Sequence, residues 1–458
     1  MVTQISHKAH VRAILVLGVP LIGSHLAQFA VTLTDAVMLG WYDVQVLAQQ
    51  VLGGMLFFTL FIMGSGFAWA VMPMVAEAES AGRVTEVRRV TRMAQWLSVL
   101  FGSVCMPVFW WSGPLLLAAG QEPAVAQGAQ DYLRIAGWAI FPALFVMVLK
   151  SYLSALERAQ VVLWVTVAAV VVNIVVNYAL IFGNWGAPEM GIKGAAIASL
   201  VVQAVSALGL GIYAAVVTPE HALFARVWRP DWEAFRAVFR LGWPIGITNL
   251  AEVGLFAASS LMMGWLGTLQ LAAHGIALQV TSAMFMVHLG LSNAATVRAG
   301  RALGRGDLHG LRRGGVVIIV ISAIMVALTV ALFLLAPAPL MALFLSPDDP
   351  DRAAVVAIGV GLLAAAALFQ LVDAAQVMAL GLLRGVQDTR VPMVIATLSY
   401  WAVGVPISYV LGFPLGLGGV GIWLGLAIGL ALAGVFMMWR FWRISLPRLD
   451  AAGLVSAE

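Results

Sequence analysis

The sequence predicts an all-α membrane protein with twelve transmembrane helices in two parallel six-helix lobes. Three observations predict this fold: the composition, the length of the apolar segments, and the distribution of Lys and Arg. Of the 458 residues, 62% are hydrophobic and 10% are charged, whereas a soluble domain carries about 25% charged residues. This composition excludes a soluble enzyme, a disordered protein and a nucleic-acid-binding protein as descriptions of the whole chain. The one cysteine, Cys105, allows no intrachain disulfide.

The apolar segments are long enough to cross a membrane, which takes about 20 residues each. The first run, from Ala13 to Gly40, is too long for the hydrophobic part of a signal peptide and is interpreted as the first span. The segments lack the strict alternation of barrel strands, which favours helices. Division at charge clusters and at Gly and Pro turns predicts spans at 13–40, 46–76, 93–118, 129–152, 160–182, 191–217, 238–266, 270–300, 314–336, 353–383, 392–412 and 418–440.

The basic residues predict the orientation of these helices. If the N-terminus is cytoplasmic, 22 Lys and Arg residues lie in cytoplasmic segments, and three, Arg134, Lys193 and Arg352, lie outside. Cytoplasmic loops of membrane proteins are enriched in Lys and Arg, and a missed helix would destroy the asymmetry. We therefore expect a multi-pass protein of a bacterial-type plasma (inner) membrane with both termini in the cytoplasm.

The two halves of the sequence are related. A shift of 224 residues aligns 17–50 with 241–274, with 10 of 34 positions identical. Six helices per half is an even number, so both halves have the same orientation, which is typical of transporters built from parallel repeats. The predicted domains are an N-terminal lobe (1–217), a cytoplasmic linker (218–237), a C-terminal lobe (238–442) and a cytoplasmic tail (443–458).

Three acidic residues lie within predicted spans rather than at their ends: Asp35, Glu252 and Asp373. A charge at mid-bilayer costs about 2.5–3.5 kcal/mol on insertion scales, so such a residue is a functional candidate by default. The alternative is a protonated acid that makes a buried hydrogen bond between helices.

The acid of the first span has polar neighbours at helical spacing. The first span places four polar side chains on one face: Ser24, Gln28, Thr32 and Asp35. The fifth span likewise aligns Thr166, Asn173 and Asn177. Because a carboxylate with amide oxygens at one depth suits Na⁺ or a proton, we expect a cation or proton site at Asp35, Asn173 and Asn177. For the two asparagines, hydrogen bonding between helices is the alternative.

The second half carries a different polar set. Its candidates for binding a cation or proton are Glu252 and Asp373, with Na⁺ as one possible ion. The substrate-binding candidates of the whole chain are Gln28, Thr32, Thr248, Gln370, Gln376, His274 and His288. The two histidines could also serve as a proton relay, and a packed and hydrogen-bonded role is the alternative for both. Residues 416–421 fit GxGxxG but follow no strand, so we interpret them as helix packing rather than a dinucleotide site.

The order and spacing of several short motifs resembles the multidrug and toxic compound extrusion (MATE) transporters. The motifs are TDAVMLG at 34–40, LAAH at 271–274, ATVRAG at 295–300 and LRG at 383–385. Glu252 and Asp373 resemble the acids of the NorM branch. The resemblance implies a V-shaped pair of lobes and a cation network at Asp35, Asn173 and Asn177. The chain differs from the family pattern at three positions: Ser199 replaces a threonine, Phe369 a tyrosine and His288 a proline.

The resemblance implies a secondary active exporter, not an enzyme, that exchanges cationic amphiphilic drugs for Na⁺ or H⁺ by alternating access. No Walker A sequence is present, so ATP is not expected to drive transport. No cofactor is expected beyond the coupling ion, and the expected partners are cationic small molecules and the lipid bilayer, with no nucleic acid. We expect a monomer. The alternatives are a lipid-linked saccharide flippase of the same superfamily, which needs a basic cavity, and a membrane-embedded enzyme.

Overall fold

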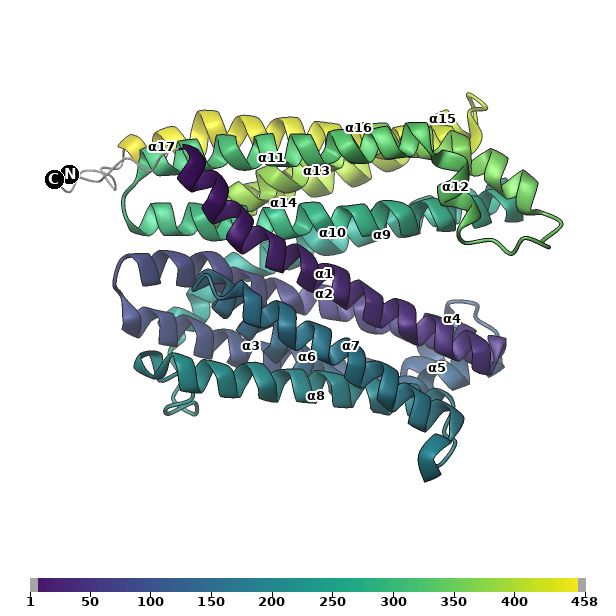
Figure 1. The fold of residues 1–458 in the computed structure, drawn as a ribbon, viewed down its shortest axis with the longest axis horizontal. Coiled ribbons are helices and arrows are strands. Elements are labelled where there is room, and N and C mark those ends of the chain that lie inside the picture. Colours follow the sequence, from purple (N-terminus) through teal and green to yellow (C-terminus); the bar gives the residue numbers. More distant parts are fainter. Residues whose placement is uncertain (1–6, 452–458) are drawn as a thin grey trace. The chain divides into compact units, whose positions relative to one another are not determined.

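The computed structural model describes residues 7–451, and twelve helical segments in this part of the chain are long and apolar enough to span a membrane (Figure 1). The predicted helix count is therefore confirmed. The first six spans are α1 (His7–Tyr42), α2 (Val44–Ser80), α3 (Val84–Trp110), α5 with α6 (Pro123–Ala136 and Ile140–Ala155), α7 (Ala159–Phe182) and α8 (Ile192–Val217). The other six are α9 (Trp232–Leu266), α10 (Thr268–Gly304), α11 (Leu308–Leu335), α13 (Arg352–Gly385), α14 with α15 (Arg390–Thr397 and Val405–Gly412) and α16 (Gly418–Arg440).

The third span ends earlier than predicted. Residues 93–118 were expected to form one helix, but α3 ends at Trp110 and a separate short helix, α4 (Ser112–Ala118), follows. Pro114 has no N–H to donate to the carbonyl of Trp110, so a continuous helix would leave this carbonyl without its partner. The carbonyl instead accepts a hydrogen bond of 3.1 Å from Arg134 Nε.

The predicted tail begins as a helix. After α16 the chain continues through a π-helical turn (Phe441–Ser445) into α17 (Leu446–Ala451). A second π-helical segment, Leu398–Gly404, joins α14 to α15. The helical path therefore continues past the predicted end of the last span to the end of the described residues.

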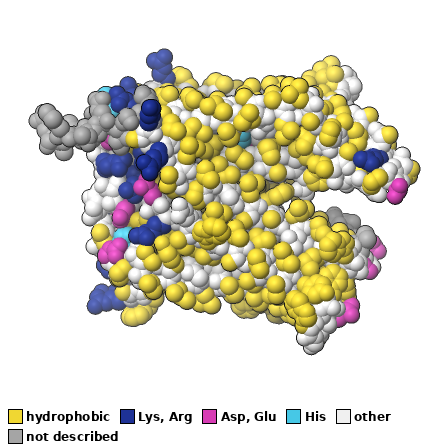
Figure 2. Space-filling view, viewed as in Figure 1, with side chains coloured by type: hydrophobic (Ala, Val, Ile, Leu, Met, Phe, Trp, Pro, Cys, Tyr) yellow, Lys and Arg dark blue, Asp and Glu magenta, His cyan; other side chains and the backbone are white. Residues whose placement is uncertain are grey.

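The outer surface of the helices is apolar. Along α11, side chains at four-residue intervals are exposed: Val316, Val320, Ile324 and Leu328. Hydrophobic side chains cover the flanks of the helices, and Lys and Arg side chains are concentrated at one end of the helices (Figure 2). Such an exposed stripe is stable only if lipid covers it, which agrees with a multi-pass membrane protein.

The chain divides into two compact units, and both boundaries fall inside long helices. Unit 1 contains the described residues up to Ile22 and those from Ile247 onward, and unit 2 contains residues 23–246. The two boundaries lie 224 residues apart, which is the shift that aligns the two halves of the sequence. Each boundary follows a helix-internal proline, Pro20 in α1 and Pro244 in α9. The predicted lobe limits at 217 and 238 remain a prediction.

A close backbone crossing occurs at equivalent places in both units. In unit 1, a Cβ at Gly290 of α10 would lie 2.6 Å from the backbone nitrogen of Ile22 in α1. In unit 2, a Cβ at Gly66 of α2 would lie 2.5 Å from the backbone nitrogen of Gly246 in α9. Gly290 and Ile22 correspond to Gly66 and Gly246 through the shift of 224 residues. Only glycine permits such an approach of two helices, as at small-residue interfaces in membranes.

The linker between the halves is attached to unit 2. Arg89 of α3 bonds Asp231 at 2.5 Å and Glu233 at 2.7 Å, and this hydrogen bond holds the pKa of the Asp231 carboxyl below its usual value. Trp96 Nε1 also donates to the carbonyl of Val227 at 2.7 Å. The long linker therefore has a fixed path along α3.

We expect Gly66→Ala and Gly290→Ala to destabilise the protein, because the added Cβ would overlap backbone atoms that cannot move away. Overpacking of this kind costs about 1–3 kcal/mol. Gly275→Ala, also in α10, is the matched control, since a Cβ there meets nothing within 4 Å. Thermal stability in detergent, measured by size-exclusion chromatography after heating, should fall for the first two variants only. Equal stability of all three would show that the crossings are looser than described.

Candidate ion and substrate sites

The acid of α1 and the two asparagines of α7 form one cluster in unit 2. Asn173 Nδ2 donates to Asp35 Oδ1 at 2.8 Å, and Asn177 Nδ2 donates to the same oxygen at 2.6 Å. Both asparagines are fully buried, and Asp35 is 8% exposed. Three turns along α1 from Asp35, Ser24 and Thr166 join the same two helices through a 3.1 Å hydrogen bond. The spacing of polar residues in the sequence thus predicts this contact correctly.

The chemistry of this cluster suits a small cation or a proton. The side-chain oxygens of Asn173 and Asn177 are buried and have no hydrogen-bond partner among the described residues. A buried carboxylate is costly unless a positive charge or a proton neutralises it. Carboxylate and amide oxygens are the ligands that hard cations prefer. The cluster therefore offers a negative charge and two unused oxygens to an incoming ion.

Two residues predicted on the Asp35 face do not join this cluster. Gln28 and Thr32 are exposed, and Gln28 Oε1 accepts a hydrogen bond of 3.4 Å from Lys150 of α6. An α-helix turns about 100° per residue, so each step of four residues rotates the side chain by about 40°. Thr32 is two such steps from Ser24, which places it about 80° around the helix from Ser24, and it is exposed. The hydroxyl of Ser199 donates to the carbonyl of Ala195 in its own helix at 3.1 Å.

Tyr132 of α5 was missed by the sequence analysis. It is 6% exposed, it interacts electrostatically with Asp35, and its hydroxyl interacts with Ser199 and Gln50. A tyrosine within a span is a weak signal, because tyrosines are also common at membrane interfaces. Only the packing of α5 reveals that this one is near the ion cluster.

The second acidic cluster lies in unit 1, on α9 and α13. Asp373 is 1% exposed, and Glu252 is half-buried and close enough to repel it electrostatically. Asp373 Oδ1 has no hydrogen-bond partner among the described residues, and neither has either amide atom of Gln370. Gln376 donates to the Tyr400 hydroxyl at 2.7 Å and keeps a buried oxygen unused. Thr248, one turn before Glu252, is 2% exposed.

A buried arginine makes the two acids unequal. Arg384 of α13 is 7% exposed, donates to Asn249 Oδ1 at 2.9 Å and attracts the carboxylate of Glu252. Among the described residues, the strongest charge acting on Asp373 is the like charge of Glu252. Of the two acids, Asp373 therefore has the less compensated charge. Sequence analysis placed Arg384 among the cytoplasmic charges, because only packing shows that it is buried beside Glu252.

His274 is held by hydrogen bonds to two neighbouring helices. Trp423 Nε1 of α16 donates to His274 Nδ1 at 3.1 Å, and His274 Nε2 is 3.1 Å from Ser260 Oγ. Because an indole N–H can only donate, Nδ1 carries no proton and the ring is the neutral Nε2–H tautomer. The Trp423 ring also contacts Phe369, 5.3 Å between centroids. The Phe369 ring therefore packs against the aromatic side chain that holds His274.

His288 has separate surroundings. Its Nδ1 is 3.2 Å from Ser322 Oγ of α11. It is 14 residues from His274, which corresponds to about 21 Å along a helix, so the two rings cannot exchange a proton directly. This geometry favours the packed and hydrogen-bonded interpretation for both histidines.

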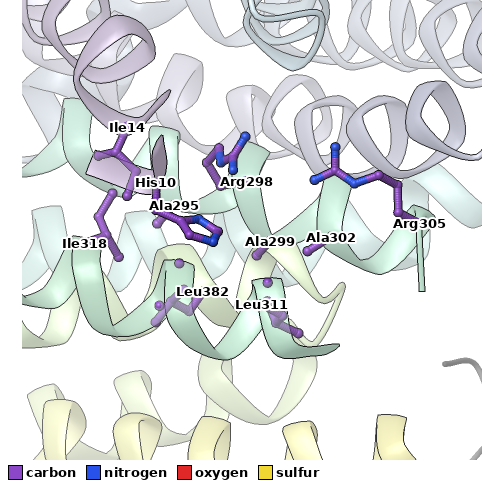
Figure 3. Close-up of a pocket in the computed structure, with 13 residues that line it drawn as sticks. His10, Ile14, Ala295, Arg298, Ala299, Ala302, Arg305, Leu311, Ile318 and Leu382 are labelled. Atoms are coloured by element: carbon purple, nitrogen blue, oxygen red, sulfur yellow. The ribbon is translucent and has the colours of Figure 1, made fainter. Parts of the chain in front are cut away.

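The remaining described residues offer no cluster of three His, Cys, Asp or Glu side chains that could hold a metal ion. A pocket in unit 1 lies where α1 crosses α10 and α11, with His10 beside Ala295, Ala299 and Leu382 and with Arg298 and Arg305 nearby (Figure 3). None of the sequence-predicted site residues lines it.

Relatives of the chain are found over nearly its whole length. It is 47% identical to "Probable multidrug resistance protein NorM" of Rhizobium meliloti (strain 1021), covering 98% of this chain and 97% of the relative. It is 37% identical to "Multidrug resistance protein NorM" of Burkholderia vietnamiensis, covering 93% and 92%. A solved eukaryotic MATE transporter has the same fold, with a TM-score of 0.87 at 19% identity over 97% of this chain and 99% of that one. The family model MatE matches residues 20–179 and 244–410, and the chain therefore belongs to the MATE family of membrane transporters.

Proposed function

We propose that the chain is a secondary active multidrug exporter, which exchanges cationic amphiphilic drugs for Na⁺ or H⁺ by alternating access. The relatives named as multidrug resistance proteins support this substrate class. The observation that carries the coupling is the Asp35 cluster, where one carboxylate oxygen accepts two amide N–H groups and two amide oxygens stay unused. Binding of Na⁺ or a proton there removes a buried negative charge.

The cluster around Asp373 is the second coupling position in this proposal. The positive charge of Arg384 compensates Glu252, so a cationic drug or a coupling ion competes mainly for Asp373. If binding of an ion weakens the binding of the drug, then binding of the drug must weaken the binding of the ion by the same free energy. A coupling free energy of ~1–3 kcal/mol between ion binding and drug binding, which is the typical size, is sufficient.

We further propose a membrane location and binding partners for the chain. The chain lies in a bacterial-type inner membrane with both termini in the cytoplasm, which the concentration of basic residues in the predicted inner loops supports. It acts as a monomer on small cationic molecules, with the coupling ion as its only inorganic partner.

Asp35→Asn should abolish coupled transport while the protein remains folded, because the amide keeps the size of the side chain and removes the charge. Asn177→Ala should weaken the apparent ion affinity and keep partial transport. Drug efflux from proteoliposomes, with a Na⁺ or a pH gradient imposed separately, measures both effects and identifies the ion. Wild-type efflux rates in Asp35→Asn under each gradient would contradict the assignment.

Asp373→Asn and Glu252→Gln should differ. Both should lose cationic-drug export, but only Glu252→Gln should also lose stability, because it removes a carboxylate that attracts the buried Arg384. A buried charge is costly unless opposite charge neutralises it. Thermal stability and drug binding across Na⁺ concentration and pH separate the two effects.

Adding Arg384→Gln to Glu252→Gln should recover part of the lost stability. Asp373→Asn should retain wild-type stability and lose the dependence of drug affinity on ions. A full ion dependence in Asp373→Asn would remove this residue from the coupling mechanism.

The orientation is tested with single cysteines in a Cys105→Ala background. We expect Asp349→Cys to react with an impermeant maleimide added to intact cells and Thr85→Cys to react only after the cells are opened. Both positions are exposed, so access depends on the side of the membrane. The reverse labelling pattern would invert the proposed topology.

A further inference from the structure

A histidine at the start of the linker is buried against helices of unit 2. His221 ends the short 3₁₀ turn η3 (Pro219–His221), and its side chain is buried. Its Nε2 is 3.2 Å from Glu79 Oε2 near the end of α2, and its Nδ1 contacts the Tyr152 hydroxyl of α6. The same hydroxyl is 2.8 Å from Thr218 Oγ1, directly after α8. We call these four residues, Glu79, Tyr152, Thr218 and His221, the His221 cluster.

The polar contacts of the His221 cluster require more protons than its neutral side chains have. Thr218 Oγ1 is also 2.6 Å from the carbonyl of Ala214, so four contacts connect this carbonyl to Glu79. A carbonyl and an ionised carboxylate only accept hydrogen bonds, whereas each hydroxyl donates one and a neutral imidazole donates one. The cluster then has three donors for four contacts. All four are hydrogen bonds only if the cluster holds one additional proton.

The additional proton belongs on the imidazole ring. The side chain of Glu79 is 32% exposed, so water stabilises its carboxylate in the ionised form. With both ring nitrogens protonated, His221 donates to Glu79 and to Tyr152. Tyr152 then donates to Thr218, and Thr218 donates to the Ala214 carbonyl. Without the proton, one of these contacts brings two acceptor atoms together and has to lengthen, so the charged ring is the form that fits this geometry.

Other charged groups lie near the His221 cluster. Glu220 of the same turn and Arg158 after α6 act electrostatically on Tyr152. In the part of the chain that the structure describes, the side-chain hydrogen bonds of His221 are those to Tyr152 and Glu79. The turn also packs against α3 and α8. The further titratable side chains at this end of α2, α3 and α8 are Glu77, Glu86, Arg88, Arg89, Arg92 and Tyr213.

The first part of the linker is attached to unit 2 through this cluster. Leu223 is buried, and the Phe224 ring stacks on Phe145 of α6, 6.3 Å between centroids. The later part of the linker is held separately by Arg89 and Trp96 of α3. His221 makes the polar attachment of the first part to α2 and α6. The strength of this attachment therefore depends on the protonation of the cluster.

We propose that the His221 cluster is a proton-binding site that fixes the start of the linker to unit 2. In the proposed topology this end of the unit faces the cytoplasm, so the cytoplasmic pH determines how firmly the linker is held. Above about pH 6.5 a free histidine is neutral, and the attached linker then binds one proton more than the released linker. Attachment therefore weakens as the pH rises, by at most about tenfold per pH unit. The site is separate from the acids of the proposed coupling mechanism and does not rest on the export function.

Amide hydrogen exchange of residues 219–225 tests the proposal in the full-length protein in lipid nanodiscs. The N–H groups of His221 and Ala222 donate to backbone carbonyls at 3.1 Å, so their exchange reports local opening of the linker. Protection factors are corrected for the pH dependence of intrinsic exchange. We expect wild-type protection to be constant at mildly acidic pH and to fall about threefold or more per pH unit above about pH 7. Constant protection across the whole range would overturn the proposal.

Two variants remove the need for the additional proton. Glu79→Gln offers an amide N–H to Nε2, so a neutral ring completes all four hydrogen bonds and protection should stay high at every pH. Tyr152→Phe removes the hydroxyl between the ring and Thr218, so protection should be lower but independent of pH. Glu86→Gln is the matched control, because it removes an acid at the same end of the unit that pairs with Arg83 at 2.7 Å. It should keep the wild-type pH dependence.

Nitrogen NMR of protein labelled with ¹⁵N-histidine reports the charge of the ring directly. At about pH 7 the His221 signal, identified by its loss in His221→Gln, should show two protonated nitrogens in the wild type and one in Glu79→Gln. A neutral ring in the wild type, or an unchanged pH dependence of exchange in Glu79→Gln, would refute the proton site. Absence of drug export with this pH dependence intact would count against the export function alone.

Discussion

A carboxylate inside a membrane span must be neutralised, and this requirement shapes both polar clusters of the chain. Water cannot solvate such a group, so the protein has to provide hydrogen bonds, a counter-charge or an exchangeable ion. Asp35 receives two amide N–H groups, and no Lys, Arg or His forms an ion pair with it in the part of the chain that the structure describes. In the proposed function, Na⁺ or a proton provides the missing positive charge. An exporter can use such a site, because ion binding there removes a buried negative charge.

The two units share a backbone frame but meet this requirement in different ways. The glycine crossings at Gly66 and Gly290 repeat at equivalent positions, since close helix packing tolerates little change. The polar residues differ. In unit 2 the acid accepts hydrogen bonds from two asparagines, whereas in unit 1 Arg384 attracts Glu252, and the strongest charge acting on Asp373 is the like charge of Glu252. The two units thus share this packing but differ in the chemistry of their polar residues.

The α1 helix contributes residues to both units and to several of their polar contacts. Its first part packs in unit 1 and its second part in unit 2. In unit 2 it carries Asp35 toward α7, Gln28 toward Lys150 and apolar side chains toward lipid. A single helix can do this because Asp35 and Gln28 lie about 20° apart around its axis but two turns apart along it, while the apolar side chains lie on the opposite face. A change in the position of α1 would therefore act on the Asp35 cluster and on the contact between Gln28 and Lys150 together.

The sequence by itself determined the helix count, the repeat and the shared helical faces of Ser24 with Asp35 and of Asn173 with Asn177. These follow from hydropathy, length and helical period, which are local properties. The tertiary structure alone decided that Asp35 meets the two asparagines, that the buried Arg384 attracts Glu252, that Trp423 fixes the tautomer of His274, that Gln28 turns toward Lys150, and that the unit boundaries fall inside α1 and α9. The period of a helix states which residues share a face. Which neighbour that face meets depends on side-chain packing between segments far apart in the chain.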